Sequence, residues 1–338
     1  MPAAVRVYLL TYRRNHLLPR ALASLLAQTF TDWTCELHND APDDPFPAQL
    51  VTQTADPRIR LVQHEKNLGP NRTFNLVFQP CAERYVCLLE DDNSWEPSFL
   101  ETLVALLDKN PSTQVAWSNM RIWQENPDTT WTDTGRTIWP IADFPSSQPA
   151  AFSWPHERHL DSLVHSNGSA LIRSGPHLAD FIVPPETPFL AMEPIRERAM
   201  RFPLLFHPQP LVNFAWTVAT ARESSSLLAA EMKALLTASY LRHAPLDRAA
   251  FAQLADRARR SPANELSGLL VSAALASHAA SFARHIRLAE WPRILASLLR
   301  HARTNVSILR ARRRHAAIWA YLDLHTARRF VEARSPSA

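Results

Sequence analysis

Glycine is scarce in this chain, which has only 5 among 338 residues. Neither G-x-x-x-x-G-K-[ST] nor G-x-G-x-x-G occurs in it. Both patterns need glycines because the backbone of the loop must come close to a phosphate. Their absence excludes the nucleotide kinases and the dinucleotide-dependent dehydrogenases that rely on such loops.

Cysteines and long apolar segments are also few. Cys35, Cys81 and Cys87 are an odd number without a C-x-x-C pair, which argues against a disulfide scaffold and suits a reducing compartment. No basic stretch followed by a long apolar run opens the chain. The most apolar later stretch, 268–283, is too short and too rich in Ser, His and Ala to span a bilayer. We therefore expect a cytoplasmic protein.

Charge is distributed unevenly. The net charge is +4, but the segment from Arg284 onward holds 12 arginines and three acids, a surplus of 9 that leaves −5 for the rest. A neutral-to-acidic body therefore carries a basic tail.

The first 120 residues alternate short apolar runs with helical patterns. Such alternation predicts an α/β fold with a mostly parallel sheet flanked by helices, in which ligands bind beyond the carboxyl ends of the strands. Polar residues follow several of these runs, so we expect them to converge. The expected strands are 5–11, 34–40, 58–64, 84–90 and 113–119, and the expected helices are 16–28, 71–79 and 97–109.

The later chain has a different character. A stretch rich in Trp and Pro is followed by two further strand patterns, with a helix around 189–201 between them. Beyond Arg222 the sequence is rich in Ala, Leu and Arg with helical periodicity and almost no strand signal. We expect a catalytic domain over 1–223 and a helical, basic C-terminal region over 224–338.

Glu90, Asp91 and Asp92 stand side by side directly after an apolar run. Two unit charges about 4 Å apart repel by roughly 4 kcal/mol at an effective dielectric near 20, so water or a cation must compensate. One interpretation is a solvated turn. In a strand, side chains two apart share a face, so Glu90 and Asp92 project together while Asp91 points away.

The order of motifs resembles the family-two glycosyltransferases, inverting enzymes with the GT-A fold that use nucleotide sugars. The resemblance covers roughly residues 5–217 and leaves the C-terminal region outside. The motifs that carry it are YLLTYRRNHLLPRALASLLAQTF, LHNDAPDD, NLGPNRTFN, LLEDDNSWEP and ETPFLAMEPIRERAMRF followed by HPQPLVNFAW.

The resemblance implies a metal site at the acidic triplet. Asp92 matches the last acid of the family's D-x-D motif, which binds Mg²⁺ or Mn²⁺ and thereby neutralises the donor's diphosphate. The sequence departs from the pattern at Glu90, which replaces the first Asp, and at Asn93, where a further Asp is common. Glu90 is therefore expected to contact ribose or metal, and Asp91 is grouped with the nucleotide contacts.

Three further donor contacts follow by position. Thr11 and Asp40 match the residues that hold the nucleotide base, Asp40 by accepting a hydrogen bond from a uracil N–H. Cap or turn chemistry is the alternative for both. Arg72 is expected at the base or the diphosphate, with a plain surface charge as its alternative.

An inverting transfer needs a carboxylate that takes the acceptor's proton. The family places this acid at the start of a helix, and Glu193 in FLAMEPIRER fits, with Arg196 or Arg198 closing the pattern. Glu186 and Glu197 are rivals. The alternative for Glu193 is a favourable charge in the first turn of a helix.

Tryptophan and histidine supply weaker signals. A sugar-stacking role is expected for one or two of the tryptophans between residues 95 and 154, although packing is the more common use of Trp. The two histidines of HERH at 156–159 lack the further ligands of a metal site. The six tryptophans are Trp95, Trp117, Trp123, Trp131, Trp139 and Trp154.

These observations predict transfer of a sugar, UDP-linked, to a hydroxyl of a glycan, glycolipid or other acceptor in bacterial polysaccharide biosynthesis. A sugar nucleotidyltransferase is the rival enzyme, but its glycine-rich N-terminal loop is absent from LLTYRRN. A nucleic-acid-binding arm at 309–315 is the non-catalytic rival, and no nucleic-acid fold signature accompanies it.

The basic tail admits two interpretations. Residues 291–322 mix apolar residues at helical spacing with arginines, as in helices that lie on membranes. Arg310, Arg312, Arg313 and Arg314 would then contact anionic lipid at the inner face of the membrane. Alternatively the apolar face packs against the catalytic domain or a second subunit of a homodimer.

Overall fold

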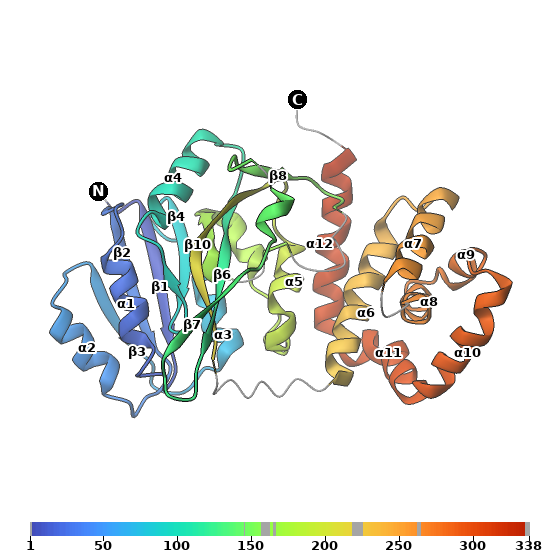
Figure 1. Cartoon of the computed structure of the whole chain (residues 1–338), viewed down its shortest axis with the longest axis horizontal. Coiled ribbons are helices and arrows are strands. Elements are labelled where there is room, and N and C mark those ends of the chain that lie inside the picture. Colours follow the sequence, from blue (N-terminus) through green and yellow to red (C-terminus); the bar gives the residue numbers. More distant parts are fainter. Residues whose placement is uncertain are drawn as a thin grey trace. The chain divides into compact units, whose positions relative to one another are not determined.

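The computed structural model describes residues 2–144, 146–156, 163–164, 167–217, 226–261 and 265–334. The chain divides into two compact units (Figure 1). The first unit comprises Met1–Ser153, Val164–Pro185 and Met200–Arg222. The second comprises Trp154–Leu163, Glu186–Ala199 and Glu223–Ala338, so it includes the segment with Glu193 as well as the C-terminal helices.

The first unit is built on a ten-stranded sheet with the order β3-β2-β1-β4-β9-β6-β10-β5, to which β7 adds beside β6 and β8 beside β10. Strands β1 to β4 pair in parallel, and so do β6 and β10, whereas the other pairs are antiparallel. The strands are β1 Val5–Thr11, β2 Trp33–Asn39, β3 Ile59–Gln63, β4 Tyr85–Glu90, β5 Ser94–Trp95, β6 Val115–Glu125, β7 Trp131–Thr137, β8 Ala150–Phe152, β9 Ala170–Arg173 and β10 Leu204–Trp216.

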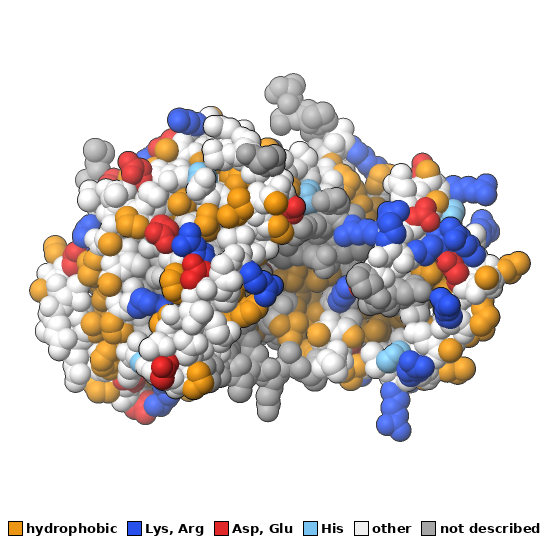
Figure 2. Space-filling view, viewed as in Figure 1, with side chains coloured by type: hydrophobic (Ala, Val, Ile, Leu, Met, Phe, Trp, Pro, Cys, Tyr) orange, Lys and Arg blue, Asp and Glu red, His pale blue; other side chains and the backbone are white. Residues whose placement is uncertain are grey.

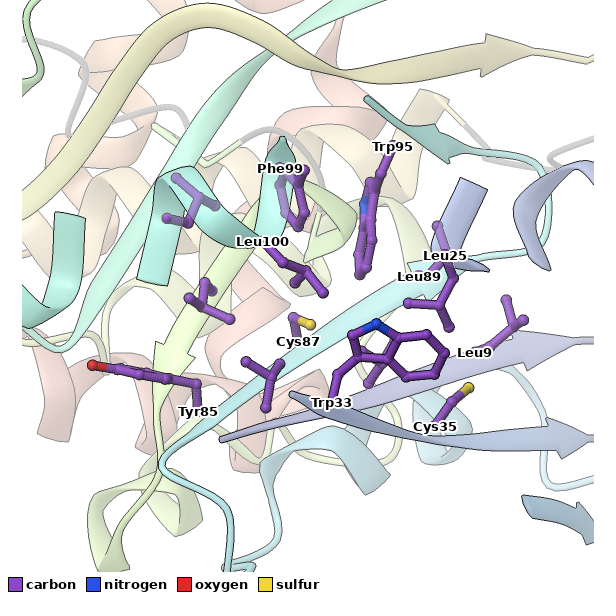
Figure 3. Packing of buried hydrophobic residues seen from close by; sticks show 14 of the residues in the cluster. Leu9, Leu25, Trp33, Cys35, Tyr85, Cys87, Leu89, Trp95, Phe99 and Leu100 are labelled. Carbon is purple, nitrogen blue, oxygen red and sulfur yellow. The ribbon is translucent and has the colours of Figure 1, made fainter. Parts of the chain in front are cut away.

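The apolar runs in β1 and β4 explain why these strands lie in the middle of the sheet. Nearly every residue of VRVYLLT and YVCLLE is buried, as expected for parallel strands covered on both faces. One hydrophobic cluster joins these strands to Leu25 of one helix and to Phe99 and Leu100 of another (Figure 3). The helices of this unit are α1 Leu18–Leu26, α2 Phe46–Thr54, α3 Pro70–Asn75 and α4 Phe99–Lys109.

The second unit is helical in the residues described. The predicted fold class, an α/β sheet flanked by helices and followed by a helical C-terminal region, is confirmed. The sheet was expected to be mostly parallel but is mixed, with four parallel and five antiparallel strand pairs among the described residues. In the residues that the structure describes, no helix is both long and apolar enough to span a bilayer. The helices are α5 Met192–Glu197, α6 Ser226–His243, α7 Arg248–Arg260, α8 Leu266–Leu275, α9 Ala279–Ala283, α10 Trp291–Arg300, α11 Ala302–Arg314 and α12 Ala316–Arg334.

The basic tail is interrupted rather than continuous. The segment 291–322 forms three helices that break at His301 and His315, so it does not present one long amphipathic face. Two of its four clustered arginines have partners within the unit. Arg312 lies over the ring of Trp319, and Arg314 pairs with the buried carboxylate of Glu231.

Glu231 of α6 is a strong internal anchor for this tail, and its replacement is expected to destabilise the second unit. It accepts hydrogen bonds from Ser307 and Arg314 and contacts His315 Nε2 at 2.8 Å. Glu231→Gln keeps the shape but removes the charge, so we expect a loss of about 1.5–3 kcal/mol in unfolding free energy. Calorimetry would measure it.

Glu265→Gln is the matched control, because Glu265 forms an exposed ion pair with Lys233 at 3.0 Å. Exposed pairs contribute about 0–1 kcal/mol, so this variant should unfold almost as the parent does. Equal losses of unfolding free energy in the two variants would show that Glu231 does not anchor the tail.

Candidate active site

The polar ends of β1, β2 and β4 lie together at one edge of the sheet. Thr11 is in register with Asn39 on β2, and Leu10 is in register with Glu90 on β4. The backbone N–H of Asp40 donates to the carbonyl of Thr11 at 3.0 Å. Three of the polar stretches singled out in the sequence therefore meet where parallel strands commonly bind ligands.

Asp91 lies at the centre of this group and is buried. The Thr11 hydroxyl donates to Asp91 Oδ2 at 2.8 Å, and the Tyr12 N–H approaches the same oxygen at 3.4 Å. Burial raises the pKa of Asp91 to about 7, and the neighbouring charge of Asp92 adds to this effect. A positive charge is therefore favourable beside this pair of carboxylates.

The expected orientation of the triplet is wrong in one respect. Strand β4 ends at Glu90, so Asp91 and Asp92 lie in a turn and the alternation of a strand does not continue through them. Asp91 does not point away from Asp92, because the Arg14 guanidinium contacts both carboxylates. Glu90 instead accepts a hydrogen bond from the Asn93 side chain.

Two arginines that were not selected from the sequence complete the group. Arg14 Nη1 bonds Asp92 Oδ2 and lies 3.3 Å from Asp91 Oδ1. Burial alone would lower the pKa of Arg14, but Asp92 and Asp91 outweigh it and raise that pKa above its usual value. Arg20 donates to the backbone carbonyl of Asp92, and its guanidinium lies 3.8 Å from the ring centroid of Trp131. The available signal for Arg14 was the basic pair in TYRRN at the end of the first strand, whereas Arg20 lies within α1.

Asp40 organises the loop that follows β3. Its carboxylate accepts from the N–H groups of Leu68 at 2.7 Å and Gly69 at 3.1 Å, and from the Thr73 hydroxyl at 3.2 Å. Gly69 has φ +78°, a conformation that favours glycine. The turn chemistry considered for Asp40 is thus present, and its contact with a nucleotide base stays a prediction.

Arg72 is exposed on α3. Among the hydrogen bonds and ion pairs of the described residues, none joins it to Asp91 or Asp92. Its predicted contact with the donor stays a prediction.

Glu193 belongs to the second unit, where it occupies the first turn of α5 and is half-buried. Its rivals differ in environment. Glu197 is buried and accepts the N–H of Leu163 at 2.7 Å, whereas Glu186 is exposed before the helix. Burial lowers the pKa of the neighbouring Arg196 to about 10, against the opposing charge of Glu193. Of the three acids, Glu193 combines partial burial with a position at a helix start.

Most of the six tryptophans serve packing. Trp95, for example, stacks on Phe99 with ring centroids 4.4 Å apart. Trp123 and Trp131 are only partly buried and remain candidates for contact with a sugar. The HERH segment lies outside the described residues except for His156. The four buried tryptophans are Trp95, Trp117, Trp139 and Trp154.

Comparison with known proteins identifies relatives of part of the chain. Residues 7–160 match the model of the family described as glycosyl transferase family 2. The putative colanic acid biosynthesis glycosyl transferase WcaA of Escherichia coli K12 is 28% identical over 102 residues, which are 30% of this chain and 37% of that protein. The Escherichia coli glucosyltransferase WfgD, named for UDP-Glc and an α-D-GlcNAc-diphosphoundecaprenol acceptor, is 24% identical over 31% of this chain and 42% of its own length.

Solved structures share the fold across most of the chain. Residues 1–349 of Staphylococcus aureus TarS superpose with a TM-score of 0.56 at 15% identity, over 98% of this chain and 92% of that one. The Pyrobaculum calidifontis mannosyltransferase PcManGT, solved with GDP-Man and Mn²⁺, gives a TM-score of 0.50 at 16% identity, over 98% of this chain and 88% of that one.

Proposed function

We propose that the chain, whose residues 7–160 match the model of glycosyl transferase family 2, moves a sugar from a nucleotide diphosphate donor to an acceptor hydroxyl with inversion at the anomeric carbon. Sugar transfer itself is the activity that the family and the relatives support. The observation that carries the proposal is the meeting of Thr11, Asp40 and the Asp91–Asp92 pair at the carboxyl ends of parallel strands.

The nucleotide is proposed to bind at this edge of the sheet. Both carboxylate oxygens of Asp40 accept hydrogen bonds from backbone N–H groups of the loop at residues 67–69. A carboxylate oxygen retains a lone pair for a further hydrogen bond, such as one from a uracil N–H. A UDP donor is supported by the TarS structures solved with UDP and UDP-GlcNAc. PcManGT was solved with GDP-Man, so we include guanine nucleotides in the tests.

The residues present fit a divalent cation. The described residues contain no group of three or more His, Cys, Asp or Glu side chains suited to a metal. Mg²⁺ sites that serve phosphates often use only one or two carboxylates, the rest of the shell being water and phosphate oxygens. Asp92 would hold Mg²⁺ or Mn²⁺, with Asp91 and Glu90 nearby. When bound, the ion would supply positive charge against the diphosphate of the leaving nucleotide.

Glu193 is proposed to take the proton of the acceptor hydroxyl as its oxygen attacks the anomeric carbon from the face opposite the nucleotide. The acceptor is proposed to be a glycan or a lipid-linked sugar in polysaccharide assembly, as the names of WcaA and WfgD suggest for those proteins. We place the reaction in the cytoplasm, at the inner face of the membrane.

The position of Arg14 leads to a prediction for the affinity of the site for a metal ion in the absence of the nucleotide donor. Its guanidinium already compensates Asp92, so a cation must displace it. Arg14→Gln removes this competitor, and we expect the affinity for Mn²⁺ without nucleotide to rise about tenfold, since two like charges at this range repel by a few kcal/mol before screening. Electron paramagnetic resonance of free Mn²⁺ measures the affinity directly.

Arg13→Gln is the matched control, because Arg13 is exposed and pairs with the exposed Asp43 at 2.6 Å. It should leave the affinity for Mn²⁺ unchanged. Equal or weaker Mn²⁺ binding by Arg14→Gln than by the parent would show that Arg14 does not compete for the site.

Titration calorimetry with UDP, GDP and UDP-sugars tests the proposed donor site. We expect one nucleotide to bind in the presence of Mn²⁺ and to bind weakly in EDTA. Binding that is equally tight in EDTA would remove the metal from the proposal, and binding of neither nucleotide would remove the donor site.

A further inference from the structure

Three leucines of the second unit are exposed on one side of α10. Leu288, just before the helix, is 89% exposed, and Leu295 and Leu299 are 52% and 77% exposed. Leu295 and Leu299 are four residues apart and therefore lie on the same face of α10. Leu288 lies in the turn that leads into the helix, and Pro292 in the first turn is exposed as well. We call these four residues the α10 face. Figure 2 shows hydrophobic and basic side chains intermingled over the part of the second unit where Figure 1 draws α9 and α10.

Exposed arginines surround this face. Glu290 is the single acid between residues 284 and 322, and it does not offset them. Its carboxylate is already bound by Arg259 at 2.7 Å and accepts the backbone N–H of Arg287. The exposed arginines next to the α10 face are Arg287, Arg293, Arg300 and Arg303.

We propose that the α10 face docks on the surface of an anionic lipid bilayer. The leucines enter the boundary between headgroups and acyl chains, while the arginines pair with lipid phosphates, which is the arrangement of helices that lie in a membrane interface. Each basic residue near an anionic surface adds roughly fivefold to the binding constant. The docking surface is thus α10 and not the arginines at 310–314, of which Arg312 and Arg314 have internal partners.

Charge complementarity selects this occupant over two others. A second copy of the chain would meet this face with the same arginines in a two-fold contact, because such interfaces pair identical patches. A nucleic acid would pair with the arginines but leave Leu295 and Leu299 in water. An anionic bilayer compensates the arginines and buries the leucines at once.

Only the biological reason for docking rests on the proposed function, because an enzyme bound to the membrane surface would reach a lipid-linked acceptor there. The test contains neither donor nor acceptor, so its outcome is separate from that of sugar transfer. Full-length protein is sedimented with vesicles of phosphatidylglycerol and phosphatidylcholine, and with vesicles of phosphatidylcholine alone, at low and physiological salt.

The variant carries Leu288→Ser, Leu295→Ser and Leu299→Ser. The control carries Leu324→Ser and Val331→Ser, which replace residues of α12 that are 50% and 65% exposed. We expect binding to anionic vesicles to fall at least tenfold in the triple variant and to stay unchanged in the control. Equal melting temperatures of the three proteins establish that folding is preserved.

A second variant, Arg293→Gln with Arg300→Gln, should lose binding to anionic vesicles and become less sensitive to salt. The proposal is overturned if the parent does not bind anionic vesicles at low salt, or if the triple serine variant binds as the parent does. Sedimentation velocity supplies the remaining outcome. A dimer of the parent that becomes monomeric in the triple variant would assign the α10 face to self-association.

Discussion

Asp92→Asn is expected to lower sugar transfer by at least about 10³-fold, because several kcal/mol of charge stabilisation at the diphosphate would be lost. The proposed metal ligand disappears while the side chain keeps its size. The fold should persist, since Arg14 retains its contact with Asp91 and Arg20 donates to the backbone carbonyl of residue 92. Steady-state kinetics with Mn²⁺ and calorimetric Mn²⁺ binding measure the two effects separately.

Asp43→Asn serves as the control for this change. Asp43 is exposed, pairs with Arg13 and lies outside the group around Asp91. The Asp43→Asn variant should transfer sugar at the same rate as the parent. Full activity of Asp92→Asn, with the same activity in EDTA, would refute the metal site at this position.

Glu193→Gln is expected to lower turnover by about 10² to 10⁴, because the amide cannot accept the acceptor's proton. Donor affinity should stay close to that of the parent, since Glu193 is not among the proposed donor contacts. Single-turnover kinetics separate the loss of chemistry from any change in binding.

Its two rivals are the controls. Glu197→Gln keeps an oxygen that accepts the N–H of Leu163, and Glu186→Gln changes an exposed side chain. Each of these two variants should therefore keep most of the turnover of the parent. Normal turnover of Glu193→Gln together with an inactive Glu186→Gln would assign the proton acceptor to the segment before α5.

The strands near the site could be predicted because their sequences are nearly continuous apolar runs. VRVYLLT formed β1 at the expected residues 5–11, and the strand expected at 84–90 formed β4 over Tyr85–Glu90. Their parallel pairing brought the polar ends together. Helix α2 was missed, since its sequence FPAQLVTQT contains a proline and buries only Pro47. The antiparallel β7 was missed because WTDTGRT has no apolar alternation.

The orientation of the acidic triplet could not be predicted because it depends on where β4 ends. An end at Glu90 turns Asp91 inward to Thr11 and Arg14, whereas one more residue of strand would have turned it away. The role of Arg14 depends on the adjacency of β1 and β4, which is a long-range pairing. Similarly, residues 186–199 group with the C-terminal helices through contacts between segments that are far apart in the sequence.

The breaks in the basic tail carry no strong sequence signal. Helix α10 ends at Arg300 and α11 at Arg314, each followed by a histidine and not by the Gly or Pro that usually marks a helix end. Internal contacts of Glu231 with Ser307, Arg314 and His315 fix the arrangement. Periodicity alone therefore predicted helical structure in this segment but not the two breaks that packing produces.

The central claim is that this chain transfers sugar from a nucleotide sugar at the edge of the sheet that holds Asp92. The most direct measurement is a panel of UDP- and GDP-sugars, each with candidate glycan and lipid-linked acceptors, in Mn²⁺ and in EDTA, with release of nucleoside diphosphate as the readout. A parallel series supplies nucleoside triphosphates with sugar 1-phosphates and detects pyrophosphate. We predict nucleoside diphosphate release that requires Mn²⁺ and is lost in Asp92→Asn. Pyrophosphate from the parallel series, with no diphosphate released from any nucleotide sugar, would contradict the claim and identify a nucleotidyltransferase.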